Sequence, residues 1–309
     1  MGVASIEKLD NASTAFKAVY DEFFAGGPPT AYEQFTEVMP NDQISIELDV
    51  IAAFPRVREW IGPKQFKDLR AYTQSIDITS YEISHEIKRK DLEYKSNGQI
   101  ARGIRTFFEQ QRFFYDDLLF AALIANTWTG YDGVALLSDS HPNTNSTGDN
   151  LTTSALTQAT LDAGVQAMEG FQSEDGKPLG TFPTHLVVGP QQRKIAHDLT
   201  GSDRLIPFSN AGVPDAVSGD VAVGSLPNYL GGAINVVVTP WVSGTKWFLI
   251  DASKSAKPMV FVENMAPTPC EQTEKTGEAR FMEDVYRYSV ESDGATAAGL
   301  WQTIYGDVS

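Results

Sequence analysis

The side chains best suited to chemistry lie together in the segment Ser138-Asp139-Ser140-His141. Serine, histidine and aspartate carry out nucleophilic hydrolysis when the histidine takes the serine proton and the carboxylate orients the histidine. The members of such a triad normally come from separate parts of a fold, and the chain contains no G-x-S-x-G nucleophile motif. We therefore interpret the segment as a hydrogen-bonded turn before Pro142. A hydrolase that uses the 132–141 loop is the less favoured alternative.

Metal, thiol and nucleotide chemistry find little support in the sequence. Asp132, Asp139 and His141 are potential metal ligands, but three scattered ligands on one loop are weak evidence for a site. The single cysteine, Cys270, excludes an internal disulfide and has no basic neighbour in the sequence that would activate its thiol. Gly231-Gly232 is not part of a phosphate-binding glycine motif. We expect no catalytic residue, no cofactor, no metal and no enzyme activity.

The composition indicates a folded chain whose charge is unevenly distributed. Of its 309 residues, 42% are hydrophobic and 21% are charged, which is typical of globular proteins. The chain contains no run of about 18 apolar residues, so we expect no membrane-spanning helix. Its start lacks the basic and apolar regions of a secretion signal.

The net charge of −16 disfavours nucleic-acid binding over the whole surface. Residues 56–112 nevertheless hold 12 basic and eight acidic residues, a net charge of +4, whereas residues 1–55 and 263–293 are acidic. This polarity predicts that basic and acidic segments of different copies of the chain meet. A basic patch without any partner is the simpler alternative.

The elements that must position these residues follow from hydrophobic periodicity. Helical spacing predicts helices over residues 3–24, 98–126, 155–172 and 190–199, with Asn97 capping the second and Thr153 or Ser154 the third. Strand patterns cover residues 44–50, 183–188, 233–239, 246–250 and 283–292, and a two-stranded ribbon with a turn or bulge near Thr79-Ser80 is expected over residues 68–90. Because helices and strands are segregated rather than repeated as βαβ units, the expected class is α+β.

Two parts of the chain have no obvious core of their own. A ribbon of two strands is marginally stable in water, and residues 30–62 read as a mostly extended stretch. We expect both parts to lie on the rest of the chain or on a neighbouring copy. We also expect that deletion of residues 1–25 spares the core fold.

An ordered set of motifs, from about residue 12 to residue 305, resembles the Mu-like phage major head subunit family, whose fold is the Hong Kong 97-type major capsid fold. The motifs are Phe54-Pro55 with Arg58-Glu59-Trp60-Ile61-Gly62, Ile87-Lys88-Arg89-Lys90-Asp91-Leu92-Glu93, Tyr131-Asp132-Gly133 with Ser138-Asp139-Ser140-His141-Pro142, Leu186-Val187-Val188-Gly189-Pro190, and Trp247-Phe248-Leu249-Ile250-Asp251.

This resemblance implies a division of the chain into structural parts. The parts are an N-terminal arm at 1–62, an extended loop or β-ribbon at 63–95, a peripheral domain at 96–183 with its spine helix at 98–126, an axial domain at 184–263, and return strands of the peripheral domain at 264–309.

The resemblance also implies a function: major capsid protein of a tailed double-stranded DNA bacteriophage, which assembles into the icosahedral shell around the genome. The implied partners are other copies in hexamers and pentamers, portal and scaffolding proteins, a possible decoration protein, and double-stranded DNA enclosed without sequence-specific binding. We expect no cleaved scaffolding segment before residue 12, and a separate scaffold is therefore implied. The implied location is the virion, with assembly in the host cytoplasm and no membrane.

Within this interpretation, charged residues of the basic and acidic segments are expected to contact neighbouring subunits. They are Lys64, Lys67, Arg70, Lys88, Arg89, Lys90, Glu283 and Asp284. A nanocompartment shell of the encapsulin type is the main alternative function. A tail or adhesion protein is a further one, against which the long amphipathic helix argues.

Overall fold

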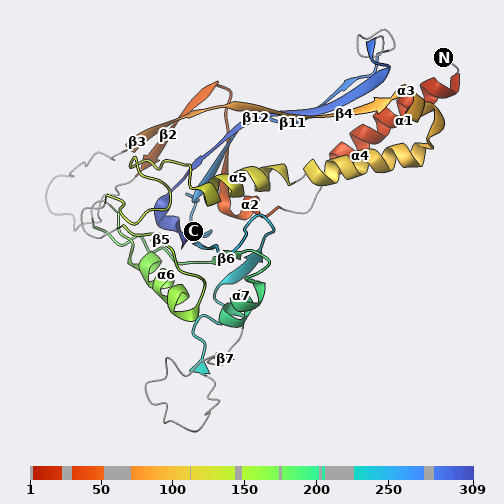
Figure 1. Ribbon diagram of the computed structural model, residues 1–309. Helices are drawn as coiled ribbons and strands as arrows, with labels where there is room; N and C mark the ends of the chain where they lie inside the picture. Colours follow the sequence, from red (N-terminus) through yellow and green to blue (C-terminus); the bar gives the residue numbers. More distant parts are fainter. Residues whose placement is uncertain are drawn as a thin grey trace.

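The computed structural model consists of a compact body and a long extension of sheet and helices (Figure 1). The structure describes residues 3–22, 30–51, 71–111, 113–142, 148–173, 176–201, 204–205, 226–274 and 282–309. Long antiparallel strands run from the body to the far end of the extension, where the N-terminal helix lies. The α+β class predicted from the sequence is confirmed.

A four-stranded sheet with the order β1-β11-β12-β4 supports the extension. Its strands are β1 (Thr36–Pro40), β4 (Thr79–Lys88), β11 (Met259–Gln272) and β12 (Val285–Ala298). The ladder between β11 and β12 contains two register shifts, between Glu263 and Met265 and between Met265 and Thr268. Tyr286, Tyr288 and Val290 are buried on one face, so the strand predicted over residues 283–292 is confirmed.

The two-stranded ribbon predicted over residues 68–90 is wrong in its pairing. β3 (Ala71–Asp77) pairs with β2 (Ser45–Ile51) in a separate sheet, whereas β4 pairs with β12. The change of phase near Thr79 therefore marks the transfer of the chain from one sheet to another instead of a turn. The β2–β3 pair buries Leu48 and Ile76 against β11 and β12, which explains the alternation predicted for residues 44–50.

The single long helix predicted over residues 98–126 is two helices. α4 (Asn97–Gln111) faces the extension, and α5 (Phe114–Ala125) enters the body, where Asn126 ends it in a left-handed conformation with φ 48°. The two helices bury their apolar faces in different clusters while they keep one helical spacing, so the periodicity does not reveal the interruption between them. Ser96, not the predicted Asn97, precedes α4, and its N–H donates to Gln99 Oε1 at 3.2 Å.

The body is built on a five-stranded sheet with the order β5-β13-β10-β6-β9. Its elements are β5 (Leu151–Thr152), β6 (His185–Val188), β9 (Asn235–Val238), β10 (Trp247–Ile250), β13 (Ile304–Asp307), α6 (Gln158–Gly170) and α7 (Arg193–Thr200). These elements confirm the helices and strands predicted between residues 155 and 250. Each residue of β10 is fully buried, as its unbroken apolar run requires of a strand covered on both faces.

The predicted cap of α6 is wrong. Thr157, instead of Thr153 or Ser154, caps the helix, because its hydroxyl accepts the Thr160 N–H at 3.2 Å. The Thr160 hydroxyl in turn accepts the N–H of Thr157 at 2.8 Å, which completes a reciprocal capping box.

The remaining described elements are short, except for the N-terminal helix. They are α1 (Val3–Tyr20), α2 (Tyr32–Phe35), α3 (Arg89–Tyr94), β7 (Arg204–Leu205), β8 (Leu226–Pro227) and the 3-10 turn η2 (Trp301–Thr303). Among the described helices, none has both the length and the apolar character needed to cross a bilayer.

Candidate functional site

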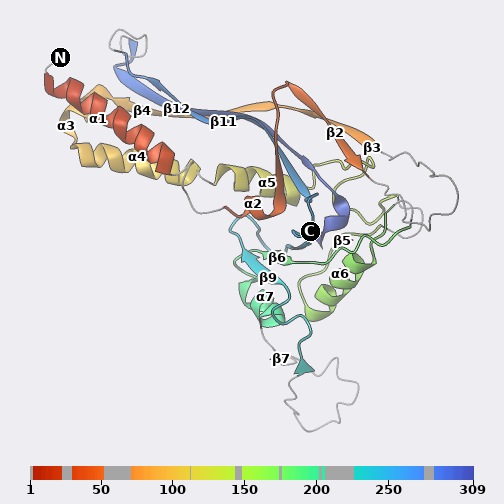
Figure 2. The ribbon, with the colours of Figure 1, turned by 180° about the vertical axis from the view of Figure 1, so that it is seen from behind.

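The far end of the extension holds a hydrophobic cluster that is separate from the core of the body, and we call it the distal cluster. It consists of Ala12, Phe16, Ile87, Ile100, Ile104, Phe108, Tyr286, Tyr288 and Val290. Figure 2 shows α1 lying along α4 beneath the sheet. The ring centroid of Phe16 is 5.0 Å from that of Phe108 and 5.0 Å from that of Tyr288.

The N-terminal helix therefore belongs to a core of its own chain. Phe16 is 2% exposed, and the Tyr20 hydroxyl donates to the Pro267 carbonyl on β11. Lys17 forms an ion pair with Glu271 at 3.0 Å. That deletion of residues 1–25 spares the core fold stays a prediction, and the burial of Ala12 and Phe16 in the distal cluster argues against it.

His85 on β4 faces the same side of the sheet. Its ring centroid is 5.6 Å from that of Phe107, and burial lowers the pKa of His85, against a smaller opposing effect of Glu86. The ring is therefore neutral at physiological pH and packs as an apolar group.

The charged residues predicted to contact neighbours fall into three groups in the structure. Arg89 pairs with Asp284 of its own chain at 3.0 Å, and Glu283 pairs with Arg287. Lys88 and Lys90 are exposed and have no ion pair among the described residues. Lys64, Lys67 and Arg70 lie outside the described residues.

Acidic side chains gather on part of the solvent-facing side of the extension sheet, which also carries Lys88 and Arg287. Glu82 on β4 lies directly opposite Glu291 on β12, and Ser80 lies opposite Asp293. Like charges facing each other across strands are unfavourable unless a positive group approaches. None of these three carboxylates pairs with a base within the part of the chain that the structure describes.

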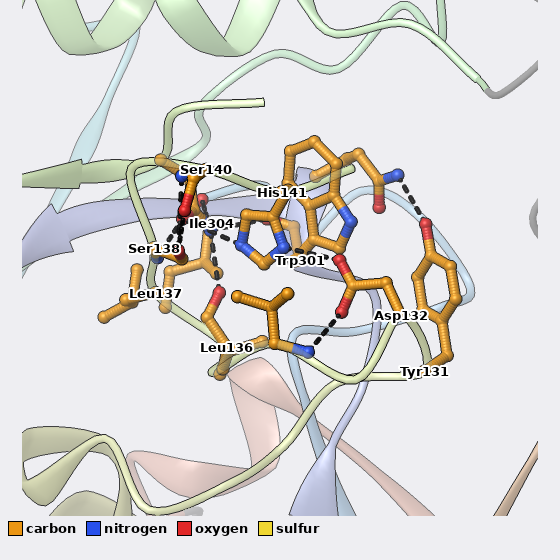
Figure 3. A network of polar contacts seen from close by, with 12 residues as sticks. Tyr131, Asp132, Leu136, Leu137, Ser138, Ser140, His141, Trp301 and Ile304 are labelled. Carbon is orange, nitrogen blue, oxygen red and sulfur yellow. Dashed lines mark hydrogen bonds and ion pairs between the residues drawn. The ribbon is translucent and has the colours of Figure 1, made fainter. Parts of the chain in front are cut away.

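The polar segment that suggested hydrolysis forms a buried network around His141 (Figure 3). The His141 side chain is buried; its Nδ1 lies 2.6 Å from Asp132 Oδ2, and its Nε2 lies 3.2 Å from Asn150 Oδ1. The ring stacks on Trp301 with centroids 4.2 Å apart and planes 2° apart. Ser138 and Ser140 contact each other, and neither contacts the histidine ring in the hydrogen bonds of this turn.

This geometry favours the structural interpretation of the segment over the hydrolase. A catalytic histidine presents one ring nitrogen to a serine and a substrate, whereas both nitrogens of His141 are bonded inside the protein. The predicted hydrogen-bonded turn is thus present. It contacts η2 through the stacking of His141 on Trp301. Within the described residues, no group of acidic, histidine and cysteine side chains could hold a metal ion.

Asn150 and Trp301 are the members of this network that the sequence did not reveal. Asn150 is fully buried and bonds to the carbonyl oxygens of Leu136, Trp301 and Ile304. Asn150 lies 151 positions from Trp301 and 154 positions from Ile304 in the sequence, so periodicity and spacing cannot predict these hydrogen bonds.

Replacing Gly148 by alanine should destabilise this network. A Cβ at Gly148 would lie 2.8 Å from His141 Cβ and 2.8 Å from Trp301 Cη2, so the stacked pair must separate. We expect a loss of about 1–3 kcal/mol of unfolding free energy, measured by urea denaturation. Gly133→Ala is no suitable control because its φ is +80°; Gly170→Ala, with open space around its Cβ, should change stability far less. Equal effects of the two substitutions would contradict the packing described for Gly148.

Comparisons with known proteins agree with the motifs. The sequence profile of a family described as phage capsid protein matches residues 71–305. The Mu-like prophage FluMu major head subunit of Haemophilus influenzae is 23% identical over 275 residues, which cover 89% of this chain and 65% of that protein. The chain thus spans slightly less than two thirds of the length of that relative.

Solved structures show the same fold. The procapsid protein of bacteriophage JBD30 matches with a TM-score of 0.57 and 22% identity, over 99% of this chain and 75% of that chain. A virus-like particle from Pyrococcus furiosus matches with a TM-score of 0.52 and 10% identity, over 95% and 97% of the two chains. The holo-SrpI encapsulin complex from Synechococcus elongatus PCC 7942 matches with a TM-score of 0.52 and 13% identity, over 91% and 87%. The architecture is the Hong Kong 97-type capsid fold.

Proposed function

The chain belongs to the phage capsid protein family, and from this membership we propose that it is the major head subunit that builds the shell of a tailed phage. The observation that carries the proposal is the match of the family profile to residues 71–305. The long extension supports it, because a subunit that projects far from its body presents large surfaces to neighbours.

We propose that the chain uses those surfaces to bind copies of itself in hexamers and pentamers. A stable contact between two proteins buries about 1,600 Å² in total, and a closed lattice multiplies many such contacts. The acidic outer face around Glu82 and Glu291 is complementary to the basic residues at 56–112 of a neighbouring copy. Lys88, Lys90 and Arg102 are exposed members of that basic stretch that form no ion pair among the described residues, so they are available to a neighbour.

We propose the division into parts with the boundaries expected above: an N-terminal arm (1–62), an extended loop (63–95), a peripheral domain (96–183 and 264–309) and an axial domain (184–263). The pairing of β2 with β3 joins the arm to the extended loop, and residues 52–70 between these strands lie outside the described residues.

Further partners follow from the family and belong to the same proposal. We infer portal and scaffolding proteins during assembly in the host cytoplasm, a decoration protein on the finished shell, and double-stranded DNA enclosed in the virion without sequence-specific contacts. A net charge of −16 suits the container, because a basic inner wall would hold DNA by its phosphates.

Electron microscopy of the purified chain, produced with and without its scaffold, tests this function. We expect closed shells of uniform diameter. A matched variant replaces residues 52–70 by a short glycine-serine linker; we expect a folded chain, as checked by circular dichroism, and no shells. A wild-type chain that stays monomeric under both conditions, as measured by light scattering, would contradict the proposal.

An encapsulin-type compartment is the second candidate, favoured by the structural likeness to the SrpI encapsulin complex. The contents of particles isolated from their natural source separate the two functions. Nuclease-protected double-stranded DNA indicates a phage head, whereas a single enclosed protein indicates a compartment.

A further inference from the structure

The two edges of the extension sheet differ in how they are protected against pairing with another strand. At one edge, β1 pairs with the first part of β11, and the rest of β11 carries Pro267 and Pro269, which have no N–H. The two register shifts of β11 precede Thr268, and the Tyr20 hydroxyl donates to the Pro267 carbonyl. Prolines, bulges and covering groups are the usual means by which a protein keeps other strands from a sheet edge.

The opposite edge is the free side of β4, which runs along the extension towards α3 (Figure 1). β4 has ten residues without proline or glycine, and its ladder with β12 has no register shift. The Arg89 N–H, directly after β4, donates to the Asp284 carbonyl at 3.0 Å, so odd-numbered residues direct their backbone groups towards β12. The even-numbered residues direct theirs to the free edge. They are Ser80, Glu82, Ser84, Glu86 and Lys88, and their edge N–H and C=O groups form no hydrogen bond within the described part of the chain.

A straight, unprotected edge of this length favours the addition of a further strand. We propose that β4 pairs antiparallel with β4 of a second copy across a two-fold axis that passes between the two His85 residues, so that two four-stranded sheets become one continuous sheet. Contacts within a ring of more than two subunits are head-to-tail, so a two-fold contact joins subunits of different rings. The inference rests on the proposed function and deepens it, because it names one contact between the rings of the shell.

The charges on β4 favour this register over the neighbouring ones. With the axis at His85, Glu82 lies opposite Lys88 of the second copy, and the symmetry forms this ion pair twice. An axis at Ser84 would set Glu82 against Glu86, and an axis at Glu86 would set that carboxylate against its own copy. Opposite charges stabilise a cross-strand pair and like charges destabilise it. Glu82 and Lys88 are both exposed, and neither forms an ion pair with another described residue.

The same register satisfies the free backbone groups and extends the apolar side of the sheet. Since His85 directs its backbone groups towards β12, the pair on the axis is a non-hydrogen-bonded pair, and the even-numbered residues on both sides of it exchange hydrogen bonds with the second copy. On the inner side, Ile83 lies opposite Ile87 of the second copy. Ile87 belongs to the distal cluster and Ile83 packs against it, so the two clusters become neighbours.

Cysteine crosslinking of the full chain tests the register, in sedimented shells and in unassembled protein. In a Cys270→Ser background, His85→Cys places two thiols at the axis, where the Cα atoms of a non-hydrogen-bonded pair lie about 4.5 Å apart, within the range of a disulfide. We expect most of the chain to migrate as a covalent dimer on a non-reducing gel after mild oxidation. Ser80→Cys is the matched control, since this exposed position lies about 34 Å from its own copy in the proposed register and should give no dimer. Equal dimer formation by both variants, or none by His85→Cys, would overturn the proposal.

Exchange of the two charges gives a second measurement that leaves His85 in place. Glu82→Lys and Lys88→Glu should each lower the yield of shells about tenfold, because each sets like charges against one another twice. The double variant has the net charge of the wild type and should recover the wild-type yield. A double variant that assembles no better than the single variants would refute the pairing of Glu82 with Lys88.

The two measurements also separate this contact from the function on which it rests. Normal shells without the dimer and without the recovery would refute the β4 contact alone. A crosslinked dimer from a chain that forms no shells would support the contact and contradict the shell function. A chain that forms neither would contradict both.

Discussion

Replacing Phe16 by alanine should lower the free energy of unfolding by about 3–5 kcal/mol. The side chain is 2% exposed and lies between the rings of Phe108 and Tyr288, so its removal leaves a cavity that α1, α4 and β12 must share. We expect a lower midpoint in urea denaturation and a lower yield of shells, because α1 no longer holds the end of the extension.

The control for this change is Phe113→Ala. Phe113 is 45% exposed at the break between α4 and α5, so the same truncation removes little buried surface. A cost below about 1 kcal/mol is expected. If the two variants lose equal stability, or if Phe16→Ala unfolds like the wild type, α1 does not dock on its own chain in solution.

Reversing the charges of Lys88 and Lys90 together should reduce the yield of shells by about tenfold or more, because like charges brought together at an interface cost several kcal/mol. Both side chains are exposed and unpaired among the described residues, so the free energy of unfolding should stay within about 0.5 kcal/mol of wild type. Arg89 is left unchanged, because Arg89→Glu would place a carboxylate beside Asp284 and disturb the subunit itself. Shell yield by sedimentation and stability by urea denaturation check the two halves of the prediction.

The matched control is the pair of changes Lys177→Glu and Lys194→Glu on the body. It changes the net charge equally, and the exposed pair of Lys194 with Asp198 contributes little to stability. We expect near-normal shells. A similar loss in both double variants would assign the effect to net charge, and normal assembly of the Lys88 and Lys90 variant would show that these two residues are not part of the interface.

The local sequence pattern was sufficient to predict the helices and strands that bury a clear apolar face. The runs around Trp247 and Val187 predict central strands, and α6 follows from its periodicity. Pairing is a different matter, since alternation shows which face of a strand is buried and not which strand lies beside it. The sequence near Thr79-Ser80 therefore predicted a turn or bulge, although β3 and β4 belong to different sheets.

Two further features depend on contacts between distant parts of the chain. The break near Phe113 is hidden because Phe108 and Leu119 keep one helical spacing while they enter separate clusters. The ring of His141 stacks on Trp301, which lies 160 positions further along the chain. Composition and spacing contain the residues of that network, and only the folded chain brings them together.

The two register shifts in β11 have a geometric consequence for any closed lattice. Extra residues in one strand bend it and increase its twist, so they set the angle at which the extension leaves the body. In a lattice of identical copies that angle is repeated in every subunit, so a small bend in each subunit affects the radius of the whole lattice. In a closed shell built as proposed above, the residues between Glu263 and Thr268 would therefore contribute to the curvature.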